Sequence, residues 1–194
     1  NCYLYWSLSN DLELVKYIIT YSYNTNPDPV NAIEKVLINH RQKSNSIIRI
    51  FNYLQEQHFT LLGEEDLVSQ YPDYLKLMPD DAWDKSFLNR TIAFSLVENI
   101  DSAIALINKY SSGHANCLIT ESYQEGRIFA MKTDSALVYI NSSPRFYRYL
   151  PGSNSVFLGV SNQKGHRRVL ITLQTFTTTK QIIVGSGEKN IIEE

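Results

Sequence analysis

Short apolar runs alternate with helix-spaced apolar positions along most of the chain. Residues 3–6 are aromatic and β-prone, and residues 35–39 have a continuous apolar centre, which is typical of strands buried on both faces. Between them, apolar residues recur at helical spacing from Leu12 to Ile19, directly after capping residues at 9–11. This pattern predicts a strand, a helix and a second strand.

The same alternation continues as far as residue 140. Ser44, Asn45 and Ser46 predict the start of a helix, and the apolar run at 59–62 predicts a strand closed by Gly63. Prolines interrupt the pattern at 24–29 and again between 72 and 79, where we expect loops. Residues 31–34 are expected to form a helical turn. The remaining expected elements are strands over 91–97, 115–120 and 136–140 and helices over 101–109 and 121–132.

Repeated strand–helix units with buried apolar strands favour an α/β fold, in which helices sandwich a mainly parallel sheet. From Arg167 the pattern changes to β-branched alternation over 169–172 and 177–184, which predicts a C-terminal β arm. We therefore expect an α/β domain over residues 1–165. The arm and tail over 166–194 are expected to belong to the same structural unit.

Charge and length restrict the classes of partner. The 194 residues carry 18 Lys and Arg against 20 Asp and Glu, a net charge of −2, so no basic surface for nucleic acid or an anionic membrane is expected. The basic cluster at 163–168 is expected to be a solvated hairpin tip. No apolar run reaches the ~18 residues of a membrane helix, and no signal-peptide pattern occurs, so we expect a cytoplasmic protein. Because the chain opens with Asn1, we expect part of a longer product to be missing.

The two cysteines and four histidines are scattered along the chain. Cys2 and Cys117 form neither a CxxC pair nor a cluster with histidine, so no metal site is expected. Each cysteine is expected to pack as a small buried apolar residue.

Two polar segments lie beside predicted strands. The segment ending in Ser112, Gly113 and His114 precedes a strand, and there it would face an anionic ligand or form a helix cap with a surface histidine. Asn141 and Ser142 follow a strand, and Arg145 lies three residues further on. That arginine would hold a carboxylate or phosphate, or would be a solvated residue after a proline turn.

Several segments in order resemble the gamma-glutamyl phosphate reductase family, the glutamate-5-semialdehyde dehydrogenases of proline biosynthesis within the aldehyde dehydrogenase superfamily. NCYLYWSLSNDLE is similar to the family's NCHVYVDESADLD, SSGHANCLITE to GSGHTDAIITE, and TDSALVYINSSPRF to VDSAAVYVNASTRF. The resemblance covers the whole chain but only the catalytic and C-terminal part of the family. It implies a fold like the catalytic domain of aldehyde dehydrogenases. The family's nucleotide-binding domain has no counterpart in the chain.

The resemblance also shows where the chain departs from the family. The family's nucleophilic cysteine lies in RPGVCNALET, which aligns with NPDPVNAIEK and places Val30 at the cysteine. The glutamate of WDTEYL, which resembles a ribose contact of the superfamily, aligns with Ser86 in WDKSFL. No catalytic residue is therefore intact. The residues that still match family motifs near the substrate are Asn31, Ser112, Gly113, His114, Asn141, Ser142 and Arg145.

These features leave three hypotheses open. The first is a non-catalytic relative of the reductases, a pseudoenzyme that forms a homodimer or larger homo-oligomer through its C-terminal β arm. The second is an NADPH-dependent glutamate-5-semialdehyde dehydrogenase completed by a separate nucleotide-binding chain. The third is a ligand-sensing or scaffold module. The family implies NADP(H) as cofactor, but no cofactor is expected to bind this chain alone.

Overall fold

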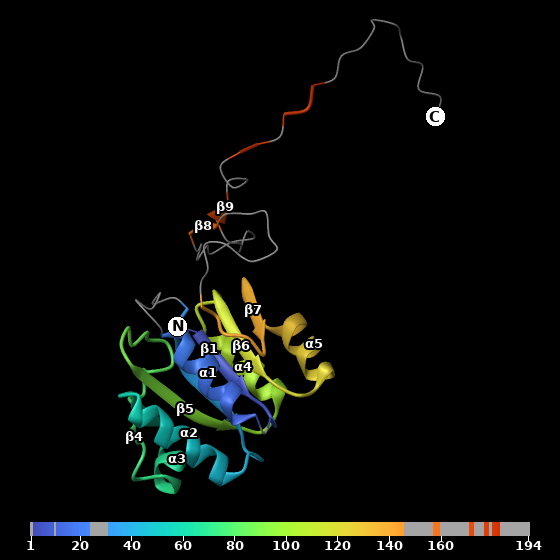
Figure 1. Ribbon diagram of the computed structural model, residues 1–194. Helices are drawn as coiled ribbons and strands as arrows, with labels where there is room; N and C mark the ends of the chain where they lie inside the picture. Colours follow the sequence, from blue (N-terminus) through green and yellow to red (C-terminus); the bar gives the residue numbers. More distant parts are fainter. Residues whose placement is uncertain are drawn as a thin grey trace, which may run out of the picture.

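A seven-stranded sheet in which every pairing is parallel forms the centre of the protein (Figure 1). The computed structural model describes residues 2–9, 11–23, 31–145, 157–159, 171–172, 177–178 and 180–182. The strand order is β4-β3-β5-β2-β1-β6-β7. The strands are β1 (Cys2–Trp6), β2 (Ile33–Asn39), β3 (Thr60–Gly63), β4 (Lys76–Leu77), β5 (Thr91–Val97), β6 (Ala115–Ile119) and β7 (Leu137–Ile140).

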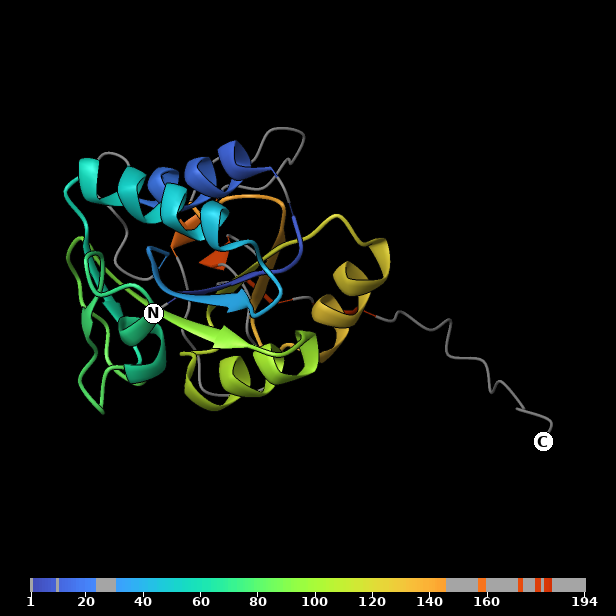
Figure 2. The same ribbon diagram turned by 90° about the horizontal axis from the view of Figure 1, so that it is seen from below.

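Helices cover both faces of the sheet, as Figure 2 shows with the sheet between two layers. The helices are α1 (Leu12–Ser22), α2 (Ser44–Glu56), α3 (Glu65–Gln70), α4 (Ile100–Tyr110) and α5 (Tyr123–Lys132). Apolar residues of α1 and α2 pack in one core cluster, and those of α4 pack with Phe129 of α5 in another. The sheet is therefore buried on both faces, which explains its nearly continuous apolar strands.

Side-chain caps set the starts of three helices. Asp11 accepts a hydrogen bond from the Leu14 amide at 2.9 Å, and Asn99 accepts one from the Ser102 amide at 3.0 Å. Ser122 caps α5 in the same way. Each cap satisfies an amide that the first turn leaves unpaired, which is worth about 1 kcal/mol.

Two local predictions are wrong. Residues 31–34 do not form a helical turn, because Ile33 and Glu34 belong to β2 and Ile33 pairs with Cys2 of β1. The ladder and the burial of Ile33 outweigh a local preference that spans only four residues. The cap of α2 also differs, since Lys43 is its N-cap without a side-chain bond and the helix begins at Ser44.

Only part of the predicted C-terminal arm lies in the described residues. β9 (Ile171–Thr172) pairs in antiparallel orientation with β8 (Phe157–Gly159). Residues 177–178 and 180–182 are assigned to no strand, and a strand requires a hydrogen-bonded neighbour. The basic cluster at 163–168 lies outside the described residues. In the described part of the chain, no helix is long and apolar enough to cross a membrane.

Candidate functional site

The amino edge of the sheet joins three segments that are far apart in the sequence. Asn31 lies just before β2 and His114 lies just before β6, so parallel pairing places both at this edge. The distance from His114 Nε2 to Asn31 Oδ1 is 3.2 Å, and both residues are only 1% exposed. Asn31 Nδ2 donates to the carbonyl oxygen of Pro144. Two predicted site residues are therefore in direct contact inside the protein.

Gly113 shapes the turn that leads into β6. Its φ of 67° lies in the left-handed region, where glycine has no Cβ penalty. The Gly113 carbonyl accepts from the Ala136 amide at 3.0 Å, and the next carbonyl, of His114, accepts from the Leu137 amide at 2.9 Å. The turn thus fixes β7 beside β6. Ser112, in the same turn, is exposed.

Asn141 lies at the opposite, carboxyl edge of the sheet and does not join His114. Its Oδ1 accepts from the Thr120 amide at 3.0 Å and its Nδ2 donates to the Thr120 carbonyl at 2.9 Å. Asn141 itself has a φ of 51°. These bonds clamp the ends of β6 and β7 together. Ser142 beside it is exposed.

The chain returns from Asn141 along α1 to the amino edge. Ser143 Oγ donates to the Ile18 carbonyl at 3.2 Å, and this bond is buried. The Arg145 guanidinium lies 4.6 Å from the centre of the Tyr21 ring. Arg145 therefore stacks beside the end of α1, in a cation–π contact that the sequence pattern did not predict.

A buried ion pair supports the loop that carries Ser86. Glu34 Oε1 accepts from the amides of Phe87 and Leu88 at 2.9 and 2.8 Å. The Lys35 ammonium donates to the Lys85 carbonyl at 2.8 Å and lies 3.7 Å from the centre of the Phe87 ring. Ser86 itself is exposed. Both charged residues thus hold this loop against the sheet.

Burial lowers the pKa of Lys35 to about 8, while the Glu34 carboxylate acts in the opposite direction. The hydrophobic pattern of the sequence did not predict this pair. The available signal was a glutamate and a lysine, adjacent, at the start of an otherwise apolar strand. Such charges are seldom buried unless they have specific partners.

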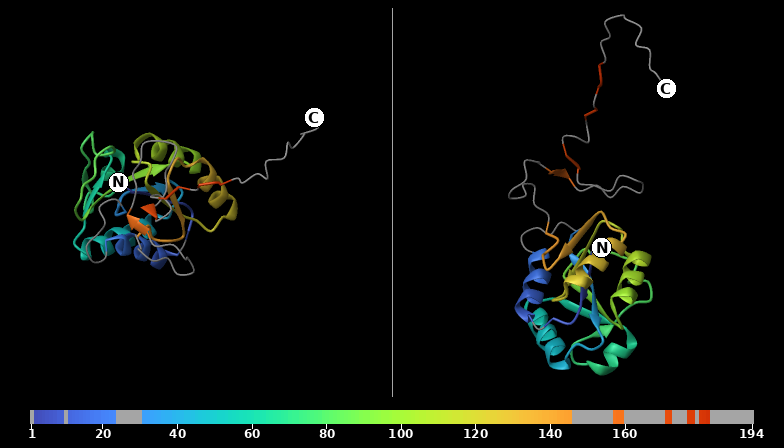
Figure 3. Two further views of the ribbon diagram at one scale, coloured as in Figure 1. Left: turned by 90° about the horizontal axis from the view of Figure 1, so that it is seen from above. Right: turned by 90° about the vertical axis from the view of Figure 1, so that its right-hand side faces the viewer.

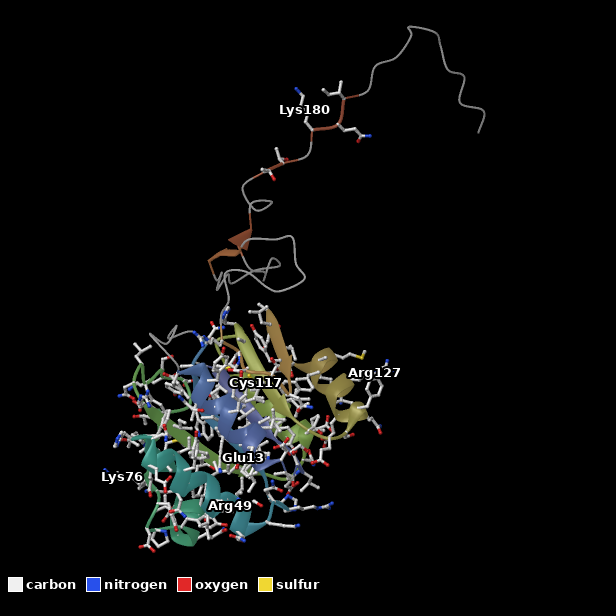
Figure 4. The ribbon with its side chains drawn as sticks, in the orientation of Figure 1. Glu13, Arg49, Lys76, Cys117, Arg127 and Lys180 are labelled. Carbon is white, nitrogen blue, oxygen red and sulfur yellow. The ribbon has the colours of Figure 1, made fainter. Side chains whose placement is uncertain are left out.

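The two thiols lie in the core on neighbouring strands. Cys2 Sγ and Cys117 Sγ are 3.8 Å apart, both side chains are fully buried, and Figure 4 labels Cys117 in the interior. Burial raises the pKa of the Cys117 thiol well above its ordinary value, and the Cys2 thiol adds to that effect. Across the described residues, no three His, Cys, Asp or Glu side chains gather as a metal site. Val30 lies outside the described residues.

Comparison with known proteins places this architecture in a family. No family model matches the chain. Gamma-glutamyl phosphate reductase 2 of Synechocystis sp. is 51% identical over 187 residues, which cover 96% of this chain and 44% of that protein. Gamma-glutamyl phosphate reductase of Clostridium botulinum is 35% identical over 188 residues, which cover 97% of this chain and 45% of that protein. The chain belongs to the gamma-glutamyl phosphate reductase family.

Solved structures of this family and superfamily share the fold. The crystal structure of gamma-glutamyl phosphate reductase from Thermotoga maritima matches 98% of this chain and 46% of its own, with a TM-score of 0.85 and 29% identity. An acetylating aldehyde dehydrogenase from Geobacillus thermoglucosidasius matches with a TM-score of 0.69 and 12% identity, over 98% of this chain and 51% of its own. The predicted α/β fold and the predicted family are confirmed. The chain spans less than half the length of the reductases it matches.

Proposed function

We propose that this chain is a gamma-glutamyl phosphate reductase domain that does not carry out the thioester chemistry expected of the family. The supporting observation is Val30, which directly precedes Asn31 in the motif aligned with the family's nucleophile. The residues that follow Val30 in this motif have structural roles of their own: Asn31 contacts His114, and Glu34 accepts from the amides of Phe87 and Leu88.

The proposed loss follows from the chemistry of the cysteine. A thiolate would attack the acyl phosphate, expel phosphate and leave a thioester that accepts a hydride. The isopropyl group of valine has no lone pair and forms no such adduct. Within the described residues, both thiols are buried in the core, and burial raises the pKa of Cys117. A thiol in that state is a poor nucleophile.

The residues present do not fit the NADP(H) that the family implies. Ser86 is exposed and stands at the position of the family's glutamate. A carboxylate has two oxygens that accept from neighbouring ribose hydroxyls, whereas serine has a single short hydroxyl. The loop that carries Ser86 is also held by internal bonds to Glu34 and Lys35.

The test is NADP⁺ reduction driven by glutamate-5-semialdehyde and phosphate, followed by absorbance. The longest native form of the protein would be compared with its Val30→Cys and Val30→Ala variants and with an active family member. We expect no turnover from the unaltered protein or from Val30→Ala. Turnover by Val30→Cys alone would show that the missing sulfur accounts for the lost activity. No turnover by Val30→Cys would indicate that loss of the cofactor contact contributes as well. Turnover by the unaltered protein would overturn the proposal.

A second proposal is self-association at the outer edge of β7. Among the described residues, no strand pairs with that side of β7. The neighbouring surface is apolar, since Tyr123 and Met131 are 82% and 78% exposed and Ile140 is 39% exposed. A cavity of about 500 Å³ lies between Tyr123, Arg127 and Ile140, and Figure 4 shows Arg127 on the outer side of α5. Open strand edges with apolar flanks are completed by other strands.

The proposed occupant of that edge is the C-terminal arm of a second copy, which is rich in β-branched residues. Analytical ultracentrifugation should show a dimer for the intact chain. Ile140→Lys should shift it to monomer, whereas Leu77→Lys on the exposed far strand β4 should leave it dimeric. A monomer at all concentrations would refute this proposal and leave the one on catalysis untouched.

A further inference from the structure

A second cavity lies at the carboxyl edge of the sheet, on the side opposite Asn31 and His114. Its volume is about 520 Å³, within the roughly 300–1,000 Å³ that is typical of small-molecule sites. The polar side chains that line it come from the loop after β2, the loop after β5 and helix α5. They are Asn39, His40, Arg41, Glu98, Asn99 and Glu125.

The topology of the sheet favours a ligand at this edge. The chain leaves β1 through α1 and joins β2 on one side, and it leaves β6 through α5 and joins β7 on the other. β1 and β6 are neighbouring interior strands, fifth and sixth in the strand order, with α1 and α5 on opposite faces (Figure 3). In open α/β sheets, ligands bind at the carboxyl ends of strands where the connections diverge in this way.

Buried polar groups orient one carboxylate of the cavity. Glu125 Oε2 accepts from Ser7 Oγ at 2.8 Å and also from Thr120 Oγ1. Ser7 and Thr120 are 1% and 5% exposed, so both donors are held in place by the core. Among the described residues, both hydroxyls that bond this carboxylate donate to Oε2, so Oε1 would receive a donor from a ligand.

The cavity contains charges of both signs. Arg41 is exposed and forms no ion pair within the described part of the chain. The first turn of α4 begins beside it, after the N-cap Asn99, and the amides of a helix start attract an anion. The acidic Asp101 of that turn is paired with Lys132 at 2.8 Å. Glu98 and Glu125 supply negative charge.

We propose that this carboxyl-edge cavity binds a free α-amino acid. Arg41 and the start of α4 would receive its carboxylate, and Glu125 with Glu98 would receive its ammonium group. Charge-assisted hydrogen bonds of both kinds are stronger than neutral ones. The site would serve regulation or sensing, since none of the residues that line it belongs to the set that matches family motifs near the substrate and it lies at the edge opposite Asn31 and His114. The proposal does not depend on whether the chain is catalytic.

The test is a titration of the ¹⁵N-labelled chain with L-norvaline, observed through its amide resonances. Norvaline lacks a side-chain carboxylate, so it does not resemble a glutamyl substrate. Pentanoate, which lacks the ammonium group, and butylamine, which lacks the carboxylate, are the matched probes. We expect norvaline to shift the amides of Arg41, Glu98 and Ile100, with much weaker effects from the other two compounds.

Substitutions separate this site from any other. Arg41→Gln and Glu125→Gln should each weaken norvaline binding about tenfold or more, and the glutamine can still accept from Ser7 and Thr120. Arg49→Gln and Glu56→Gln on α2 are the matched controls and should bind normally. No shifts up to about 10 mM, equal binding of pentanoate or butylamine, or shifts confined to Asn31 and His114 would overturn the proposal.

Discussion

Replacing Lys35 by methionine should change the free energy of unfolding by an amount that depends on pH, and the variant should compare more favourably with the unaltered protein at neutral pH than at alkaline pH. The Lys35 side chain is fully buried in β2, and burial lowers its pKa from 10.5 to about 8. The unfolded chain therefore binds this proton more tightly than the folded one. The resulting penalty on folding is fully present below about pH 8 and is lost as the pH rises towards 10.5.

The magnitude follows from the two pKa values. The gap between 10.5 and about 8 corresponds to about 3 kcal/mol at pH 7, at roughly 1.4 kcal/mol per pKa unit. By about pH 9.5 the remaining penalty is about 1.4 kcal/mol, so about 2 kcal/mol is lost between the two conditions. The bond of the ammonium to the Lys85 carbonyl and its contact with Phe87 favour the charged form, which makes 3 kcal/mol the upper limit.

Urea denaturation at about pH 7 and about pH 9.5, followed by circular dichroism, measures the effect. We expect the change in the free energy of unfolding caused by Lys35→Met to be about 2 kcal/mol more favourable at the lower pH than at the higher pH, on top of a cost for leaving the buried Glu34 carboxylate without its partner. Lys76→Met on the exposed strand β4 is the matched control. It should change the free energy of unfolding by the same amount at both pH values. A change caused by Lys35→Met that is the same at both pH values, or that is less favourable at the lower pH, would refute the reasoning.

Three further substitutions test individual contacts by chemical denaturation. Asn31→Ala should cost about 1–3 kcal/mol, because it removes the buried contact with His114 at 3.2 Å; a loss below about 0.5 kcal/mol would contradict a buried bond of this kind. Asn141→Ala should cost more than Asn141→Gly, because both lose the bonds to Thr120 but only glycine tolerates a φ of 51° freely. Gly126→Ala should stabilise α5 by about 0.5–1 kcal/mol, because the added methyl would lie 3.6 Å from its nearest neighbour; a destabilised variant would show that α5 packs more tightly.

Periodicity was sufficient to predict most of the fold. The strand over 91–97 has the same bounds in the structure, because its apolar residues all pack in the buried clusters and charged residues, Arg90 and Glu98, flank it. The turn expected at 31–34 failed because the pairing of Ile33 with Cys2 is a contact across the sheet, which no local pattern records. β4 has only two residues, both exposed, so it carries no apolar period to detect.

The candidate site could be predicted only in part, for a topological reason. Residues that precede two parallel strands meet at one edge, so the contact between Asn31 and His114 was accessible in principle. Asn141 follows a strand and belongs to the other edge, where it clamps Thr120. The role of Lys35 depends on the distant loop around Phe87, and sequence spacing gives no indication of that approach.

The position of β1 between β2 and β6 has a consequence for synthesis. One side of β1 pairs with β2 soon after both are made, but the other side needs β6, and the Tyr3 amide bonds to Asn116, 113 residues later. At about 5–20 residues per second, a ribosome takes roughly 6–20 s to cover that interval. Throughout it, the nascent chain presents an unpaired apolar strand edge, and unpaired edges recruit other chains. A chaperone that shields this edge until β6 emerges would raise the yield of folded protein. It would have little effect on the thermodynamic stability of the protein once folded.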